Sequence, residues 1–480
     1  MNIHDYLRIQ SRRNFFRTCA GGIETIALAN LLAGDGRAAD STASATNPLA
    51  PKAPHFAPKA KNVIFLFMEG APSQMDLFDP KPALQKYHGQ SLPPSMTKDL
   101  RLAFIKPSAA VLASPRIFKP HGQSGIEFSD FIPNIASCAD DICLVRGMVT
   151  DAFNHHPGQL LLFTGSQQFG RPTLGAWVLY GLGSESQNLP GFVVLSSGVG
   201  TSGGASNFAP GFLPSAYGGV MFRGGPEPIL YLSNPEGVTA QQQRAELDVL
   251  RDLNQERLKK TGDVEIASRI ASYELGFRMQ SAAPDLIDFS KESAATLDMY
   301  GVNQEPTRPF ATNCLLARRM VERGVRFVML MHASWDQHTY LNRELKKNCA
   351  ITDQPTAALI RDLKQRGLLD STLVVWGGEF GRTPMVENRV TSDPENAGRD
   401  HHPFGYSIFM AGGGIKGGTV VGKTDDLGFN VVEDKVHVHD LQATILNRLG
   451  FDHTKLSYRY MGRDFRLTDV EGNVVQKMLA

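Results

Sequence analysis

Acidic and imidazole side chains follow two apolar runs in the second half of the chain. Asp336 and His338 come a few residues after the run Val325–Met331, and Glu379 comes just after the run Thr372–Trp376. Carboxylate and imidazole groups together are the ligand set expected for a divalent metal that serves hydrolysis. The residue types and their positions therefore indicate a metal site.

A third cluster of the same chemistry stands in a predicted loop. Asp400, His401 and His402 are consecutive, and the apolar run Tyr406–Ala411 follows them. Any one such cluster is more often a capped or solvated loop than a site. Three clusters beside apolar runs favour a site of some kind, because acids and imidazoles gather where catalysis or binding occurs.

The first apolar run of the chain adds a candidate from far away in the sequence. Asn62–Met68 is almost continuously apolar, which is typical of a strand covered on both faces. Glu69 stands at its carboxyl end, where open α/β sheets place their sites, and is a weaker candidate ligand. Asp76, a little further on, is expected either to cap a helix or to line the site.

A histidine pair opens a predicted apolar helix in the first half of the chain. His155 and His156 precede Pro157, and the apolar stretch Leu160–Phe163 follows. The first turn of a helix presents free amide N–H groups and a positive dipole end, which suit an anion. This segment is therefore a candidate for contact with a negatively charged substrate.

Strand and helix patterns alternate around these clusters. A short helix over 313–324 leads to the run that begins at Val325, and an amphipathic helix over 352–366 leads to the run that begins at Thr372. Two such β–α–β passages in sequence predict an α/β fold.

Other stretches are predicted to surround this framework. The pattern over about 235–300 is helical and predicts an insertion or covering layer. The span 197–229 is rich in Gly, Ser and Pro and predicts long loops over the site. Residues 40–61 are of low complexity and predict a disordered linker, so that 62–480 would form a single domain.

Length, charge and hydropathy exclude several classes of protein. A chain of 480 residues can bury a large core as one domain or two. The 49 basic and 48 acidic residues give a net charge of +1, so no broad affinity for nucleic acid is expected. No run approaches the about 20 apolar residues that cross a bilayer, so we expect no integral membrane protein.

The N-terminus carries a candidate export signal. Arg12 and Arg13 precede a moderately apolar stretch, Cys19–Ala33, and small residues then offer a cleavage point. The segment 1–39 resembles a twin-arginine signal, which would make the twin-arginine export machinery a partner and the protein periplasmic or extracellular. An Arg-rich amphipathic helix is the alternative.

Four cysteines would remain after such a signal is removed: Cys138, Cys143, Cys314 and Cys349. In an oxidising compartment they would allow two bridges, and Cys138–Cys143 with Cys314–Cys349 is one of three pairings. Buried free thiols are the alternative, and no cysteine stands in a C-x-x-C zinc pattern.

The chain resembles the alkaline phosphatase and sulfatase superfamily, and within it a secreted family of sulfatase-like proteins known as domain of unknown function 1501. The resemblance covers most of the chain after the signal. It implies an alkaline phosphatase-like, three-layer α/β/α sandwich around a mostly parallel sheet, with the site at the carboxyl ends of strands. It rests on the segments Gly70–Pro82, Asn154–His156, Ala317–Arg319, Trp335–His338, Gly378–Arg382 and Gly398–Pro403.

The resemblance also locates the reactive position. In sulfatases the nucleophile lies in a Cys/Ser-x-Pro-x-Arg segment that ends, five residues further on, in Thr-Gly. The segment His155–Gln159 has the same spacing and puts His155 where the formylglycine precursor would be, with no Cys or Ser available there. The late Asp-Asn/His-Gly segment of sulfatases resembles Glu379–Gly381, in which Phe380 replaces one ligand.

What remains resembles a rearranged metal site for zinc, manganese or calcium. Such a metal would lower the pKa of bound water and replace the missing side-chain nucleophile. The resemblance leaves open whether His401 or His402 completes the ligand set. The candidate ligands are Asp336, His338, Glu379, Asp400, His401, His402 and, more weakly, Glu69.

Four further residues receive catalytic roles from the resemblance. Arg382 or Arg399 could neutralise a sulfate or phosphate through paired N–H donors. His155 or His156 could act as general acid to the leaving alcohol. For Arg382, an ion pair under the sheet is the alternative.

Two functions from different classes fit the sequence. The first is an exported, metal-dependent hydrolase of sulfate or phosphate esters, acting on a small molecule or a polysaccharide. The second is a catalytically inactive protein of the same fold that binds a sulfated glycan or another anion, because fold alone does not fix function. A phosphoglycerate-mutase-like enzyme is disfavoured, since export would remove it from glycolytic substrates.

Overall fold

Apolar runs in the sequence form the strands of a central sheet in the computed structural model of the chain. β1 (Asn62–Met68) is buried at every position. Its side chains alternate between two hydrophobic core clusters: Ile64 and Leu66 enter one, and Phe65 and Phe67 enter the other. This confirms the prediction that the run is a strand covered on both faces.

The predicted export signal (1–39) and the first part of the predicted linker (40–46) lie outside the residues that the structure describes. Within the described ranges, no helix combines the length and the apolar character that a membrane span requires. The described residues are 47–198, 201–223, 229, 232–387 and 396–480.

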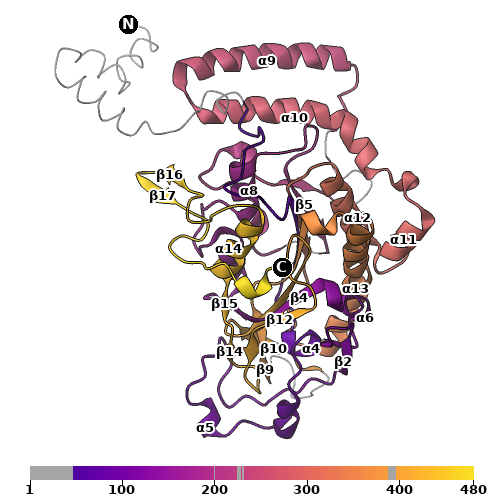
Figure 1. Cartoon of the computed structure of the whole chain (residues 1–480), viewed down its shortest axis with the longest axis vertical. Coiled ribbons are helices and arrows are strands. Elements are labelled where there is room, and N and C mark those ends of the chain that lie inside the picture. The colour runs from indigo at the N-terminus through magenta and orange to yellow at the C-terminus, as the bar shows by residue number, and fades with distance from the viewer. Residues whose placement is uncertain (1–46, 199–200, 224–228, 230–231, 388–395) are drawn as a thin grey trace, which may run out of the picture. The chain divides into compact units, whose positions relative to one another are not determined.

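Nine strands of the described residues form the central sheet (Figure 1): β1 (Asn62–Met68), β4 (Ile142–Val149), β5 (Phe192–Ser197), β6 (Val220–Phe222), β7 (Phe327–His332), β8 (Thr372–Gly377), β11 (Tyr406–Ala411), β12 (Thr419–Val421) and β15 (Val436–His437). Their order is β12-β4-β11-β8-β1-β7-β5-β6, and β15 also pairs with β4. β11 is antiparallel to β4 and β8, whereas the other pairings are parallel. The sheet is therefore mostly parallel, as predicted.

Helices cover both faces of this sheet (Figure 1). One layer contains α6 (Pro133–Ala136), α10 (Val264–Ile287), α11 (Ala294–Tyr300), α12 (Arg308–Glu322) and α13 (Leu341–Gln365). The opposite layer contains α7 (His155–Thr164), α8 (Leu174–Leu182) and α14 (Val438–Arg448). The predicted three-layer α/β/α sandwich is confirmed.

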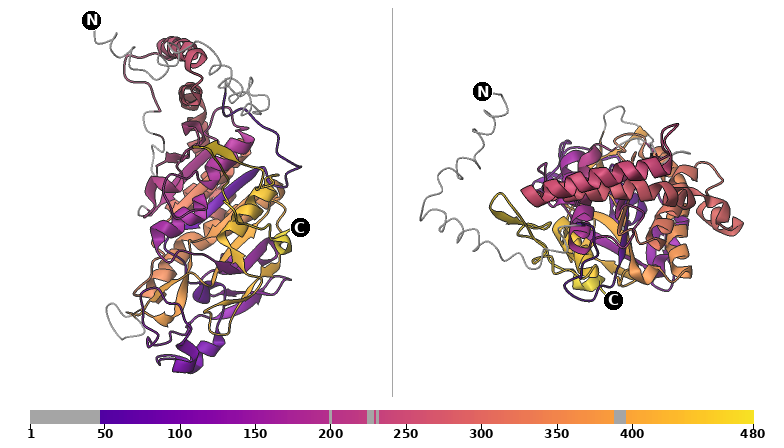
Figure 2. Two further views of the ribbon diagram at one scale, coloured as in Figure 1. Left: turned by 90° about the vertical axis from the view of Figure 1, so that its left-hand side faces the viewer. Right: turned by 90° about the horizontal axis from the view of Figure 1, so that it is seen from above.

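Helix α9 (Ala240–Thr261) lies alongside α10 and away from the sheet (Figure 2). It begins at Thr239, which accepts the N–H of Gln242 in a capping box, and none of its residues is buried. Helices α9, α10 and α11 fill the stretch that was predicted to be helical.

Shorter strands pair outside the central sheet. One such hairpin, β9–β10, carries residues of the candidate site. The pairs in the described chain are β2 (Phe118–His121) with β3 (Ile126–Ser129), β9 (Gly381–Val386) with β10 (Arg399–His402), β13 (Lys423–Thr424) with β14 (Val431–Glu433), and β16 (Tyr458–Tyr460) with β17 (Arg463–Phe465).

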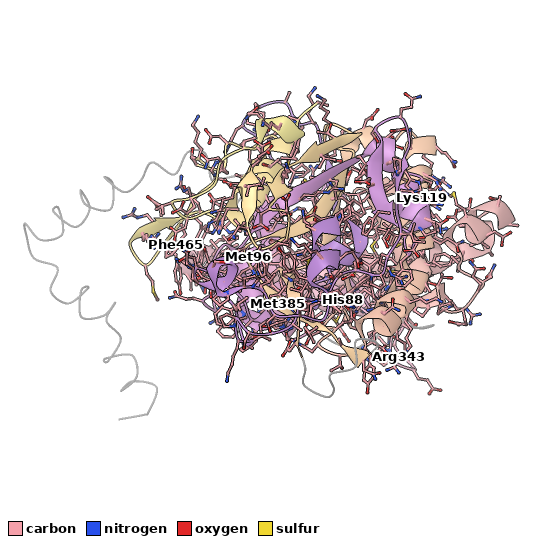
Figure 3. The ribbon with its side chains drawn as sticks, turned by 90° about the horizontal axis from the view of Figure 1, so that it is seen from below. His88, Met96, Lys119, Arg343, Met385 and Phe465 are labelled. Atoms are coloured by element: carbon pink, nitrogen blue, oxygen red, sulfur yellow. The ribbon has the colours of Figure 1, made fainter. Side chains whose placement is uncertain are left out.

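The irregular segment between β1 and β2 packs against the β9–β10 hairpin. It contains the short helices α4 (Gln74–Leu77) and α5 (Pro94–Thr97). Val111 forms a β-bridge with Met385 of β9, and both side chains are fully buried in a third hydrophobic cluster. Figure 3, which shows the molecule from below, places Met385 of β9 beside His88, which belongs to the segment between β1 and β2. Packing rather than regular structure therefore fixes β9.

The expectation of a disordered linker is wrong for residues 48–61. The hydroxyl of Tyr217 donates to the carbonyl of Pro48 over 3.1 Å, and the N–H of Ala60 donates to the carbonyl of Arg448 over 2.8 Å. Ala60 is fully buried. Low complexity did not prevent packing, because these contacts use the backbone, which every residue carries.

The four cysteines of the described chain are buried free thiols. The two-bridge alternative is therefore wrong, and the free-thiol alternative is confirmed. Burial raises the pKa of Cys143 to about 12, which leaves this thiol protonated and unreactive.

Candidate metal centre

Three neighbouring parallel strands deliver three carboxylates to one edge of the sheet. β8, β1 and β7 lie side by side, so their carboxyl ends coincide. Glu69 follows β1, Asp336 follows β7 and Glu379 follows β8. This is the edge at which open α/β sheets place their sites.

A glycine allows the ends of β1 and β7 to come together. Gly70 has a φ of +110°, and a Cβ atom there would lie 2.4 Å from the backbone nitrogen of Asp336. Its N–H donates to Glu379 Oε1 over 3.2 Å. Any side chain at this position would separate two of the carboxylates.

Helix α7 contributes an imidazole from its first turn. The side chain of Asn154 accepts the N–H of His155 at the start of the helix. His155 and Gln159 are four residues apart and share a helix face, whereas His156 points elsewhere. His155 Nδ1 lies 2.6 Å from Glu379 Oε1, and the ring of His156 packs on Phe169 instead, with centroids 4.8 Å apart.

The β9–β10 hairpin contributes a second imidazole. His401 is the cross-strand partner of Arg382. His401 Nδ1 lies 2.7 Å from the carbonyl oxygen of Phe153, so Nδ1 carries the hydrogen and Nε2 keeps a lone pair. Burial, with the positive charge of Arg382 nearby, lowers the pKa of His401 and favours the neutral ring. A neutral imidazole is the form that binds a metal.

A third imidazole is oriented in the same way. His338 Nδ1 is hydrogen-bonded to the carboxylate of Glu387, which leaves Nε2 on the inner side of the ring. A carboxylate behind an imidazole is a common support for a metal ligand, because it fixes the ring and raises its basicity. The inner nitrogens of His338 and His401 are 3.0 Å apart.

The three imidazoles converge on one oxygen atom of Asp336. Asp336 Oδ1 lies 2.7 Å from His338 Nε2, 3.2 Å from His155 Nε2 and 3.3 Å from His401 Nε2. One ligand atom from each of the four residues lies within 4.8 Å of the others. Neighbouring ligands of a tetrahedral zinc ion are roughly 3.4 Å apart, given zinc–ligand distances of about 2.1 Å. The residues present therefore fit a divalent metal.

One buried atom supports this fit independently. His155 Nε2 makes no hydrogen bond of good geometry, although it faces a carboxylate. A buried imidazole nitrogen without a hydrogen-bond partner is costly, and a shared cation would satisfy it. Asp336 is 41% exposed, so the group stays open to water and to a substrate.

A second group of possible ligands adjoins the first. It consists of Glu69, His155 and Glu379, whose ligand atoms also lie within 4.8 Å of one another. His155 belongs to both groups, with Nε2 towards Asp336 and Nδ1 towards Glu379.

Charge in the two groups is shared between acids and imidazoles. Burial lowers the pKa of His155, but contacts with Asp336 and Glu379 outweigh it and raise the pKa to about 9. Burial also lowers the pKa of His338, but contacts with Asp336 and Glu387 outweigh this effect and raise the pKa. Burial raises the pKa of Asp336, but the three imidazoles hold it below its usual range.

Glu69 is held by a loop as well as by a helix. Gln159 Nε2 and the N–H of Ser202 donate to Glu69 Oε1 over 2.9 and 3.2 Å. The carbonyl oxygen of the buried Gln159 side chain accepts in turn from Asn207. Burial and the charge of Glu379 raise the pKa of Glu69. The described part of the Gly/Ser/Pro-rich span thus reaches the site, as predicted.

Arg382 is fully buried, and its N–H groups are occupied by the chain. It donates to Asp336 Oδ1 over 2.5 Å, to the carbonyl of Ala71 over 3.0 Å and to the carbonyl of Arg399 over 3.0 Å. Arg382 therefore forms an ion pair with Asp336, at the carboxyl edge of the sheet rather than under it.

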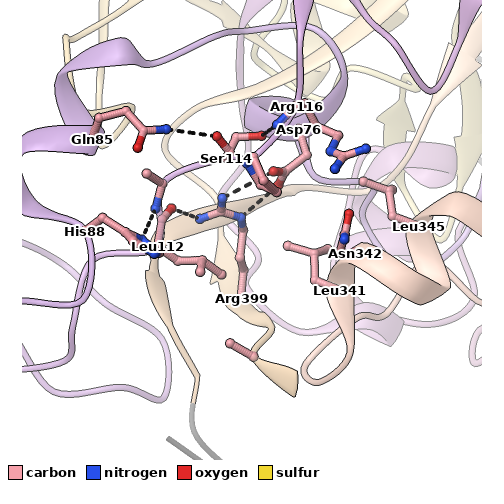
Figure 4. A pocket seen from close by; sticks show the side chains of 13 residues that line it. Asp76, Gln85, His88, Leu112, Ser114, Arg116, Leu341, Asn342, Leu345 and Arg399 are labelled. Atoms are coloured by element: carbon pink, nitrogen blue, oxygen red, sulfur yellow. Dashed lines mark hydrogen bonds and ion pairs between the residues drawn. The ribbon is translucent and has the colours of Figure 1, made fainter. Parts of the chain in front are cut away.

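Arg399 lines a separate pocket. Its guanidinium pairs with Asp76 over 2.9 Å and donates to the carbonyl of Leu112 (Figure 4). It also donates to the carbonyl of Thr383. His88 also lines this pocket. Asp76 lines the pocket rather than the metal groups, although Ser73 donates to it beside the short helix α4.

The structure places His402 and Asp400 outside the two groups described above. His402 Nε2 bonds to the carbonyl of Phe429, and burial lowers its pKa to about 4. Asp400 accepts the N–H of Phe104 over 2.7 Å. Together with His338 and Glu387, Asp400 forms a third group of possible metal ligands.

Sequence reasoning missed the structural roles of two residues in this region. Glu387 supports His338 but had no distinguishing pattern, since it stands just beyond the end of the short strand β9. Gln159 positions Glu69, and its spacing of four residues from His155 on a predicted helix was a signal that could have identified it.

The chain is distantly similar to solved structures. Three of them are PsFucS1 sulfatase from Pseudoalteromonas sp. (12% identity, 82% of this chain, 68% of that chain, TM-score 0.36), the lipoteichoic acid synthase LtaP from Listeria monocytogenes (8%, 85%, 78%, 0.37) and a Mg-bound mutant of TAB5 alkaline phosphatase (12%, 74%, 92%, 0.29).

The sequence itself gives a more definite result. No curated protein matches it. The family described as a protein of unknown function, DUF1501, matches residues 60–479, which includes the described strands, helices and candidate ligands. The chain therefore belongs to the DUF1501 family.

Proposed function

We propose that the protein is a metal-dependent hydrolase of sulfate or phosphate esters that works without a formylglycine nucleophile. The observation that carries the proposal is the convergence of three imidazole nitrogens on Asp336 Oδ1, with no nucleophilic Cys or Ser at the position of His155. A bound divalent metal supplies Lewis acidity there and lowers the pKa of water.

The residues of the chain divide this work between them. Asp336, His155, His338 and His401 would hold the ion, and their imidazole-rich chemistry favours zinc or manganese over calcium, which prefers oxygen ligands. Glu69 and Glu379 would hold a second ion together with His155.

Arg382 would act by fixing Asp336 rather than by binding the substrate, because its N–H groups are already occupied. His156, with its ring on Phe169, lacks a contact that supports the role of general acid. His155 faces Asp336 and Glu379, so we propose it as a metal ligand rather than as the general acid.

The alternative, an inactive protein that binds sulfated glycans or anions, has less support. Such a site needs free cationic donors, and Arg does this best through two parallel N–H bonds. Both Arg382 and Arg399 are fully buried and spend their donors on Asp336, Asp76 and backbone carbonyls. Export remains a proposal that rests on the paired arginines near the N-terminus.

A hydrolysis assay tests the proposal. Full-length protein loaded with zinc or manganese should hydrolyse aryl sulfates or aryl phosphates, and Asp336→Asn should lower kcat/KM by at least about a hundredfold. His156→Gln is the matched control, since His156 neighbours a proposed ligand without facing the group, and it should retain activity. A metal-loaded, folded protein that hydrolyses no ester would favour the binding function instead.

A further inference from the structure

Two exposed aromatic rings stand beside the candidate metal centre. Phe104 is 54% exposed and Phe153 is 47% exposed, although large apolar side chains are ordinarily buried. Their ring centroids are 5.8 Å apart, and the ring of Phe104 is also 5.6 Å from that of His401. An apolar surface therefore extends from solvent to one of the proposed ligands.

The backbone of both residues is bonded to β10, the strand that carries His401. Asp400 Oδ2 accepts the N–H groups of Phe104 and Ile105 over 2.7 and 3.1 Å. The carbonyl of Phe153 accepts the hydrogen of His401 Nδ1 over 2.7 Å. These bonds fix the backbone of both residues, and the edge-to-face contact between the two rings holds the side chains together.

We propose that Phe104 and Phe153 form a subsite for a flat ring in the alcohol part of the ester. This inference rests on the proposed function and adds a substrate class to it. An ester whose sulfate or phosphate group is held between the imidazoles and carboxylates must extend its alcohol part towards solvent, where these rings stand. A preorganised aromatic pair gains most from a flat partner, either an aryl group or the C–H face of a pyranose.

Binding of phosphonates tests this subsite without turnover, because their C–P bond is not hydrolysed. The zinc-loaded full-length protein would be titrated calorimetrically with methylphosphonate, phenylphosphonate and a glucose phosphonate. We expect at least one ring compound to bind about three- to tenfold more tightly than methylphosphonate. The phenyl and glucose arms distinguish an aryl from a pyranose substrate.

Variants locate the effect. Phe104→Ala and Phe153→Ala should each reduce the preference for the ring compound towards unity and leave methylphosphonate binding unchanged, which also shows that the variant is folded. Phe104→Tyr should retain the preference. Phe56→Ala is the matched control, because Phe56 is 42% exposed and its backbone N–H is bonded to the carbonyl of Gly450 rather than to a residue of the site.

The outcomes separate two kinds of failure. If methylphosphonate binds but no ring compound binds better, or if the preference survives both alanine variants, the subsite is wrong and the hydrolase proposal stands. If methylphosphonate does not bind the metal-loaded protein at all, the proposed function fails, and the subsite fails with it.

Discussion

The hydrogen-bond partners of each imidazole ring decide the chemistry of the candidate centre. The carbonyl of Phe153 holds His401, so that its inner nitrogen keeps a lone pair, and the carboxylate of Glu387 holds the ring of His338. His155 and His338 differ from His401, since both nitrogens of each of these two rings face carboxylates. A ring between two acids binds a proton tightly when no metal is present.

This difference predicts a pH dependence of metal binding. With a pKa of about 9, His155 is protonated in the metal-free protein at neutral pH, and an incoming metal must displace that proton. Metal affinity should therefore rise by at least about tenfold per pH unit up to about pH 9 and then level off. The raised pKa of His338 steepens the rise in the same direction.

Competition with a chromophoric chelator at several pH values measures this slope. His155→Gln should flatten it, while His156→Gln should keep it. An affinity that stays constant between about pH 7 and pH 9 in the wild-type protein would show that no proton is displaced.

At the scale of residues, the sequence predicted which residue types form the site better than it predicted which way their side chains point. Asp400, His401 and His402 were equivalent candidates, because nothing in the sequence marked β10 as a strand. In a strand, alternate side chains point to opposite faces, so His401 turns towards Asp336 while His402 turns towards Phe429. His155 and His156 separate for the corresponding reason in a helix.

At the scale of elements, a buried ion pair joins α4 to the β9–β10 hairpin. Asp76 of α4 and Arg399 of β10 are both almost fully buried, and Arg399 adds bonds to two carbonyls. Burial raises the pKa of Asp76, but the charge of Arg399 outweighs it and lowers the pKa. The pair fixes the hairpin that positions His401.

Breaking this pair should destabilise the protein strongly. Asp76→Ala leaves a buried guanidinium without its counter-charge, which costs about 3–5 kcal/mol of unfolding free energy. Urea denaturation of the metal-free protein measures the loss. Adding Arg399→Met to Asp76→Ala should recover most of it, and a single variant as stable as wild type would contradict this role for the pair.

The two long helices α9 and α10 should differ in their sensitivity to substitution. Leu253 of α9 is 64% exposed, and Leu286 of α10 is fully buried in the main core. Leu253→Ala should change the unfolding free energy by less than about 0.5 kcal/mol, whereas Leu286→Ala should cost about 2–5 kcal/mol. Equal losses in denaturant titrations would mean that α9 packs more tightly than its exposure indicates.

The long elements were predictable from the sequence, and the short ones were not. β1, β7 and β8 are continuous apolar runs, and burial on both faces leaves little choice of structure. The hairpin β9–β10 has mostly polar residues whose burial depends on contacts with the segment near Val111. Such contacts join residues far apart in the chain, so no local pattern reports them.

At the scale of the whole molecule, the sheet gathers ligands from five segments of the chain. Glu69, His155, Asp336, Glu379 and His401 are contributed by the ends of β1, β7 and β8, the start of α7 and the strand β10. The two proposed ions would connect the central sheet to α7 and to the β9–β10 hairpin. The resemblance of the motifs predicted this architecture, whereas the assignment of His155 as a ligand needed the geometry.

The metal content of the purified full-length protein tests the central claim most directly. Elemental mass spectrometry should find zinc or manganese at about one ion per chain or more, because the ligand set is largely preformed. Asp336→Ala with His338→Ala should lose at least one ion, and His156→Gln should lose none. A folded wild-type protein that holds no divalent metal, even after incubation with zinc and manganese, would contradict the account.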